Sequence, residues 1–130
     1  MSLRGRLMEK QLLIHDIEVG FRSLDEWSPE NERDFEFCVD IEIGLDGTNE
    51  TMLFYLTVTS LLRLHSIIKG SFLSQRFIVE KYEPKNIYEF IERIVNLNKF
   101  DNWEDAIEFL KYYFSHEYFN YNNKYKYIND

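Results

Sequence analysis

The chain has 130 residues, of which 45% are hydrophobic and 17% aromatic, with 5 glycines and 2 prolines. This composition is typical of one globular domain and argues against two domains or a long disordered region. A chain of this length buries roughly two-thirds of its unfolded surface, so its core needs no disulfide or metal. Cys38 is the single cysteine and has no internal partner for a bridge. No apolar run approaches the length of a membrane span and no signal-peptide pattern occurs, so we expect a soluble, cytoplasmic protein.

The formal net charge is -8, and it is unevenly distributed. Residues 11–60 contain 12 acidic and 2 basic side chains, whereas residues 61–130 contain 10 of each. Phosphates of nucleic acids and anionic membranes repel such a chain, so neither is an expected partner. The acidic stretch indicates either a solvated face or a surface that meets a basic partner.

The first predicted strand spans residues 11–19. Alternation places Leu13, Ile17 and Val19 on one side, with His15 on the side of Leu13. Gly20 ends this strand. The turn-forming and charged residues of 22–34 predict a surface loop that carries one aromatic side chain, Trp27.

The clearest strand pattern covers residues 35–45, where apolar side chains hold every second position. Glu36, Asp40 and Glu42 fall between them, which makes one face apolar and the other acidic. Asp46-Gly47 favours a tight turn, and residues 52–59 then alternate again. We therefore expect a hairpin, with Tyr55 on the strand next to the acidic row.

A short connecting helix and a fourth strand follow the hairpin. Ser60 can cap a helix that runs from Leu61 to about Ile68 and ends at Lys69-Gly70. Residues 76–82 are rich in β-branched and aromatic side chains, which is typical of a strand covered on both faces.

Two longer helices close the domain. Pro84 begins the first, whose apolar positions from Ile87 to Val95 recur at helical spacing. Asp101 and Glu104 have the spacing of a capping box at the start of the second. Its predicted inner face runs from Trp103 to Phe114 and contains the apolar positions between them.

The element order is thus strand, strand, strand, short helix, strand, helix, helix. This order predicts a mainly antiparallel sheet of about four strands with helices packed on one face, which is the α+β class. The predicted domain spans 10–119, and residues 1–9 and 120–130 are predicted to be terminal tails.

Few residues in this chain offer reaction chemistry. Cys38 has no basic neighbour that would activate its thiol, and the three histidines lie 50 residues or more apart. Phosphate-binding and nucleophile motifs are missing from the sequence. We therefore expect no metal, no cofactor and no enzymatic activity.

Glu36, Asp40 and Glu42 form the one carboxylate row that could act as acid and base. Alternate residues on one strand face lie about 7 Å apart, near the carboxyl separations of glycosidases. A hydrolase also needs a cleft around both acids, whereas this row is predicted on the solvent side of a hairpin. Acids beside Trp27 and Tyr55 are better suited to meeting a basic protein surface.

A family resemblance covers residues 12–121. It is carried by three segments in the second half of the chain and by two upstream segments, namely Ile78–Tyr82, Ile87–Ile91, Trp103–Ala106, Asp25–Glu30 and Phe35–Phe37. In these segments the chain resembles the immunity protein 8 family of bacterial polymorphic toxin systems. It departs from that family by a Tyr- and Asn-rich tail after Asn120 and by Ser115-His116.

The resemblance implies an α+β domain, encoded beside a toxin, that binds the toxin's C-terminal domain and blocks it. It implies no enzymatic activity and no cofactor, and it implies that Trp103 is a core residue. The predicted partner-binding residues are the acids and aromatics of the acidic stretch: Asp25, Glu26, Trp27, Glu30, Glu32, Asp34, Glu36, Asp40, Glu42 and Tyr55.

Two alternatives stay open at this point. One is a small ligand-binding or hydrolytic domain that uses Glu36, Asp40 and Glu42. The other is a structural subunit whose exposed hairpin edge pairs with a second copy. Neither the toxin's chemistry nor the oligomeric state follows from the sequence.

Overall fold

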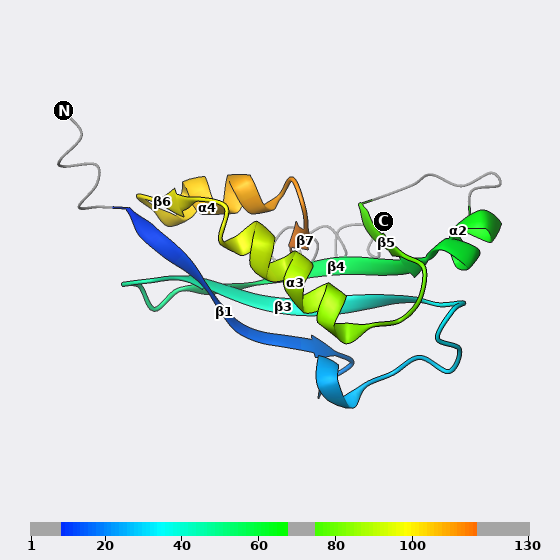
Figure 1. Ribbon diagram of the computed structural model, residues 1–130. Helices are drawn as coiled ribbons and strands as arrows, with labels where there is room; N and C mark the ends of the chain where they lie inside the picture. Colours follow the sequence, from blue (N-terminus) through cyan, green and yellow to red (C-terminus); the bar gives the residue numbers. More distant parts are fainter. Residues whose placement is uncertain (1–8, 68–74, 117–130) are drawn as a thin grey trace, which may run out of the picture.

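The computed structural model describes residues 9–67 and 75–116, and they form one sheet with helices on one of its faces (Figure 1). The strand order is β2-β1-β3-β4-β5. The three long strands are antiparallel neighbours: β1 (Lys10–Val19), β3 (Glu36–Leu45) and β4 (Thr51–Ser60). β5 (Arg76–Val79) runs parallel to β4, and three strands are two residues long: β2 (Arg22–Ser23), β6 (Lys99–Phe100) and β7 (Ser115–His116).

Two helices cover the sheet, α3 (Pro84–Val95) and α4 (Trp103–Leu110) (Figure 1). The shorter α2 (Leu61–Ile67) continues directly from the end of β4, and a 3-10 turn, η1 (Leu24–Glu26), follows β2. The predicted α+β class with a mainly antiparallel sheet is confirmed. The predicted count of four strands is wrong, because a two-residue strand has too few positions to show an alternating pattern.

The core lies between the sheet and the two long helices. Along β3, Val39, Ile41, Ile43 and Leu45 are at most 1% exposed. Each buried aliphatic side chain of this kind contributes about 1.5–3 kcal/mol to stability. The same face receives the even positions of β4 and the apolar stripes of the helices: Phe54, Leu56, Val58, Ile87, Ile91, Ile94, Val95, Ala106 and Leu110.

A bulge in β1 reverses one prediction from the sequence. The register with β3 shifts between Ile14 and Asp16, so Leu12 is buried with Ile17 whereas Leu13 is 40% exposed. A bulge inserts one extra residue and therefore changes the face on which the following residues lie. The prediction that Leu13 lies on the same face as Ile17 and Val19 is wrong for this reason.

The helix caps are only partly as expected. Ser60 caps α2, since its Oγ accepts a hydrogen bond from the Arg63 amide at 3.2 Å. The cap of α4 is Asn102 and not Asp101: the Asn102 side chain accepts from the Asp105 amide at 2.9 Å. Asn and Asp are equally good caps, so spacing alone placed the helix start one residue early.

The fourth predicted strand is shorter and less covered than expected. β5 ends at Val79, and Ile78 is 39% exposed because β5 is the last strand of the described sheet on this side. The predicted helix end at Lys69-Gly70 and the predicted tail 120–130 lie outside the described residues. Within 9–67 and 75–116, no helix is long and apolar enough to cross a bilayer.

Gly44 provides a test of the packing on the sheet face opposite α3 and α4. A Cβ at this position would lie 2.7 Å from His15 Nε2 and 3.1 Å from the Glu50 carbonyl oxygen. We expect Gly44→Ala to lower the free energy of unfolding, measured in urea, by about 1–2 kcal/mol. His15→Ala in the same chain should recover part of this loss because it removes the nearer contact. Strictly additive effects of the two substitutions would contradict this packing.

Candidate protein-binding face

The sheet face opposite α3 and α4 carries the acidic row. Because successive side chains of a strand point to opposite faces, burial of Val39 and Ile41 under the helices turns Asp40 and Glu42 away from them. The pairing of β3 with β4 sets Tyr55 directly opposite Asp40. The structure therefore brings Asp40, Glu42 and Tyr55 together, as the alternation indicated.

β1 adds two carboxylates that were not among the predicted residues. Asp16 lies opposite Glu42, and Glu18 lies opposite Asp40. Residues paired in this way have Cβ atoms about 4.5–5.5 Å apart. We call Asp16, Glu18, Asp40 and Glu42 the acidic quartet. Its β1 half could not be found without the register between β1 and β3, which the bulge displaces.

Glu18 is the quartet member whose negative charge is unfavourable in the unbound protein. Partial loss of hydration, followed by the carboxylates of Asp16, Asp40 and Glu42, raises the pKa of Glu18 above its ordinary value. Like charges directly opposite each other destabilise a sheet. The ion pairs found among the described residues do not involve Asp16, Glu18 or Glu42. A surface of this kind is suited to cationic groups supplied by another molecule.

Two predicted residues are instead neutralised within the protein. Arg76 Nε donates to Glu36 Oε2 at 2.9 Å, and Thr59 Oγ1 donates to the same oxygen at 2.9 Å. Burial alone would raise the pKa of Glu36, but these hydrogen bonds outweigh it and lower the pKa. Asp34 accepts from Arg63 Nε at 2.7 Å. Glu36 and Asp34 therefore connect β5 and α2 to the start of β3.

Trp27 is placed differently from the expectation of an anchor beside the acids. Its ring packs at 4.3 Å between centroids against Phe37, whose side chain points to the helix-covered face. The Tyr82 hydroxyl donates to the Trp27 carbonyl oxygen at 2.8 Å. Trp27 thus belongs to an aromatic cluster at the margin of the core, and the structure does not bring it next to Tyr55.

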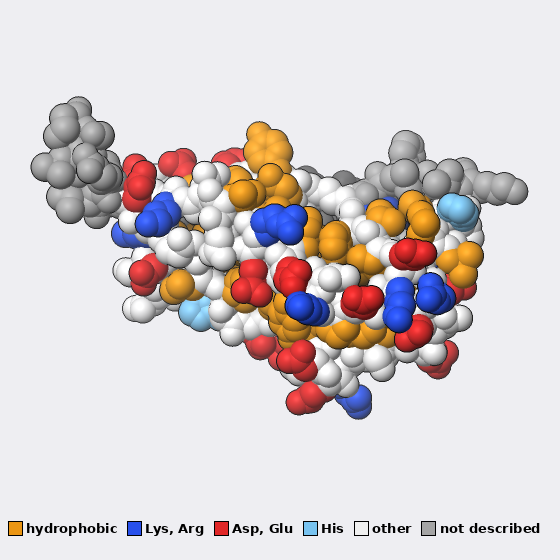
Figure 2. All heavy atoms as spheres, viewed as in Figure 1, with side chains coloured by type: hydrophobic (Ala, Val, Ile, Leu, Met, Phe, Trp, Pro, Cys, Tyr) orange, Lys and Arg blue, Asp and Glu red, His pale blue; other side chains and the backbone are white. Residues whose placement is uncertain are grey.

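The remaining predicted acids are exposed and lie in the segment between β2 and β3, away from the β1–β3 pairing: Asp25, Glu26, Glu30 and Glu32. Acidic and basic side chains are interspersed over the surface that Figure 2 shows, with α3 in front. The quartet lies on the opposite face, where strand register brings its four carboxylates together.

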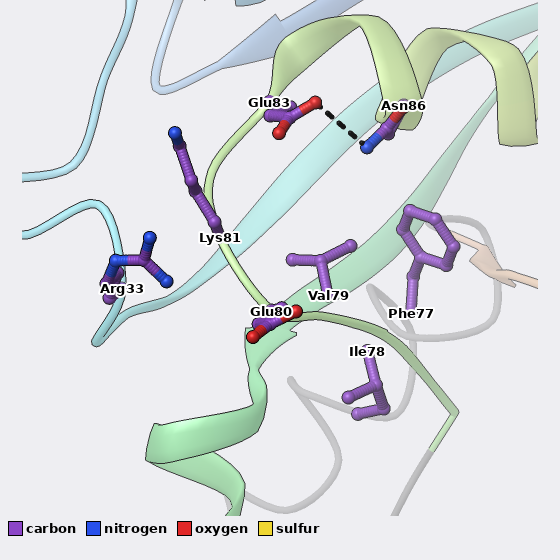
Figure 3. Close-up of a pocket in the computed structure, with 8 residues that line it drawn as sticks. All are labelled: Arg33, Phe77, Ile78, Val79, Glu80, Lys81, Glu83 and Asn86. Carbon is purple, nitrogen blue, oxygen red and sulfur yellow. Dashed lines mark hydrogen bonds between the residues drawn. The ribbon is translucent and has the colours of Figure 1, made fainter.

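Three hollows on the surface bear on the alternative of a ligand-binding or hydrolytic domain. The first, of about 480 Å³, lies beside β5 and the start of α3 and is lined by mixed charges, with Arg33 and Lys81 near Glu80 and Glu83 (Figure 3). A second lies between Trp27, Glu36 and Arg63, and a third lies beside α2. None of the three is lined by Asp40 or Glu42, and Glu36 lines only the second, so none of them encloses two of the three acids of this alternative.

Two further kinds of site are a reactive Cys38 thiol and a cluster of metal ligands. Loss of hydration and then the nearby Asp40 charge raise the pKa of the Cys38 thiol to about 11, so it is protonated at neutral pH and a poor nucleophile. Over residues 9–67 and 75–116, no three His, Cys, Asp or Glu side chains are grouped so as to hold a metal ion.

We expect Glu18→Gln and Glu36→Gln to change the stability of the fold at pH 7 in opposite directions. The raised pKa of Glu18 means that its charge opposes folding above the unfolded-state pKa, so Glu18→Gln should stabilise the protein at pH 7. The lowered pKa of Glu36 means the reverse, so Glu36→Gln should destabilise it at pH 7. Both differences should shrink as the pH falls to about 4, where carboxyls of the unfolded chain become protonated. Urea unfolding at both pH values measures this, and equal signs for the two variants would contradict it.

Comparison with known proteins agrees with the resemblance found in the sequence. The family model described as Immunity protein 8 matches residues 12–121. No curated protein and no solved structure matches the chain. The matched region covers most of the chain and includes nearly all of the sheet and both long helices. The chain therefore belongs to the Immunity protein 8 family.

Proposed function

We propose that this protein is an immunity protein that binds the C-terminal domain of a cognate toxin and neutralises it by covering its active surface. Membership of the Immunity protein 8 family supports the role of toxin inhibitor. The observation that supports the mode of binding is the acidic quartet. The proposed site of action is the cytoplasm of the cell that makes both proteins.

The quartet supplies a physical reason for binding a basic partner. In the unbound protein, Glu18 and Asp40 face each other across β1 and β3. Loss of hydration, then the charge of Asp16 and then that of Asp40, raise the pKa of Glu18. Lysine or arginine side chains of a partner would replace this repulsion by attraction. Opposite potentials also accelerate the encounter of two proteins and exclude wrong partners. A toxin with a basic active surface, such as a nuclease, fits this face.

We propose that the protein neutralises the toxin by covering its active surface and not by catalysing a reaction. The family is generally non-enzymatic. A hydrolase built on Glu36, Asp40 and Glu42 would need a cleft around two of them, and none of the three hollows is lined by Asp40 or Glu42. The charged sheet face is suited to a protein surface of comparable area.

Co-expression with the toxin domain encoded beside its gene tests the function itself. We expect cells that make both proteins to survive and the two proteins to purify together at a 1:1 ratio or as a symmetric assembly. Cell death, with the protein folded and soluble and no complex formed, would contradict the proposal.

A pair of matched variants tests the docking face. Glu18→Gln with Glu42→Gln removes two charges from the quartet, and Glu92→Gln with Glu104→Gln removes two exposed charges from α3 and α4. We expect the first pair to slow association with the toxin about tenfold at low salt, because surface charges act mainly on the association rate. The second pair should leave the rate within about twofold of wild type.

Salt separates a charge effect from a folding effect in the same measurement. The difference in association rate between the two double variants should become smaller at high ionic strength, where exposed charges are screened. Urea unfolding of both variant pairs checks that slower association does not come from unfolding. Equal association rates for both variants at low salt would contradict docking through the quartet.

A further inference from the structure

The turn between β1 and β2 contains a residue that is unusual there, Phe21. Val19 pairs with Arg22, so Gly20 and Phe21 are the two central residues of a two-residue hairpin turn. Both have positive φ, 56° at Gly20 and 70° at Phe21, which is the pattern of a type I′ turn. Asn and Gly are favoured at such positions, whereas a bulky aromatic residue is rare there. Phe21 is the one non-glycine residue with positive φ in the described part of the chain.

The Phe21 side chain is also almost completely in water. It is 95% exposed, more than any other large hydrophobic residue of the described chain. Tyr112, the next most exposed at 79%, has a hydroxyl that water can bind, whereas a phenylalanine ring has no polar atom. Single exposed apolar residues are common. This one, however, occupies a backbone conformation that disfavours its side chain, so neither local conformation nor burial explains a phenylalanine at position 21.

Phe21 extends the acidic surface. It follows Glu18 of the quartet by three residues, and Glu18 is paired with Asp40 on one side and Ser23 on the other. Asp25 and Glu26, both exposed, follow in η1. The ring therefore stands at the tip of a hairpin that carries Glu18 on its first strand and Arg22 on its second, with Asp25 and Glu26 following in η1. An aromatic anchor surrounded by charged side chains is the usual arrangement of an energetically dominant interface residue.

We propose that Phe21 is the apolar anchor of toxin binding, and that its ring enters an apolar pocket on the toxin whose rim carries basic side chains. This inference rests on the proposed function and specifies the chemistry of the partner's surface. The quartet would set the rate of encounter, and the ring would set the lifetime of the complex. Most affinity differences between related complexes lie in the dissociation rate, which is where an anchor acts.

Phe21→Asn separates binding from folding. Asparagine adopts positive φ more readily than phenylalanine, so the variant should be at least as stable as wild type in urea unfolding. We expect its dissociation from the purified toxin domain to be at least tenfold faster, with an association rate close to that of wild type. Phe21→Tyr keeps the ring and should bind close to wild type. Tyr112→Asn is the control for loss of an exposed aromatic elsewhere and should leave dissociation unchanged.

The outcomes distinguish this inference from the proposed function. Wild-type dissociation kinetics in Phe21→Asn would overturn the anchor while leaving the immunity role intact. A loss of stability in Phe21→Asn would show that the ring serves the fold, and would also overturn the anchor. Failure of the wild-type protein to bind the toxin domain would overturn both proposals.

Discussion

Strict alternation along β3 is the constraint on which the rest of the structure depends. Val39, Ile41, Ile43 and Leu45 are buried beneath α3 and α4, and their burial forces the intervening residues onto the opposite face. A shift of one residue would exchange the two sets and place carboxylates in the core. The apolar residues thus fix the position of Asp40 and Glu42, although neither acid contributes to the core. Pairing with β1 and β4 then determines which side chains adjoin these acids.

The acidic residues of this stretch divide into two groups by their neighbours. Glu36 and Asp34 have arginine partners, and they join the start of β3 to β5 and α2. In the quartet, carboxylates face carboxylates, and loss of hydration followed by these like charges raises the pKa of Glu18. The charge of Glu36 stabilises the fold, whereas the charge of Glu18 opposes it. The unfavourable charge of Glu18 supports the proposal that this face binds a partner, and so does the Phe21 ring, which is exposed at the adjacent turn.

Much of this fold could be predicted from local patterns, because the long strands and helices bury one face each at a regular spacing. The hairpin of β3 and β4 and the stripe of α3 are of this kind. The sheet face on which Leu13 lies could not be predicted, because a bulge is set by tertiary pairing and leaves no periodic signal. Half of the quartet was missed for the same reason, because Asp16 and Glu18 join it through register. Trp27 was assigned to the surface by its polar neighbours, whereas packing on Phe37 places it at the core margin. Phe21 could have been noticed only as an aromatic residue following Gly20 between two strands.

Cross-saturation NMR on the complex with the cognate toxin domain tests the central claim most directly, because it reports which amides of this protein lie against the toxin. The account predicts the strongest effects in residues 16–22 of β1 and its turn and in residues 40–42 of β3. Effects confined to α3 and α4, with the β1–β3 face and the Gly20–Phe21 turn unaffected, would contradict docking through the open face of the sheet.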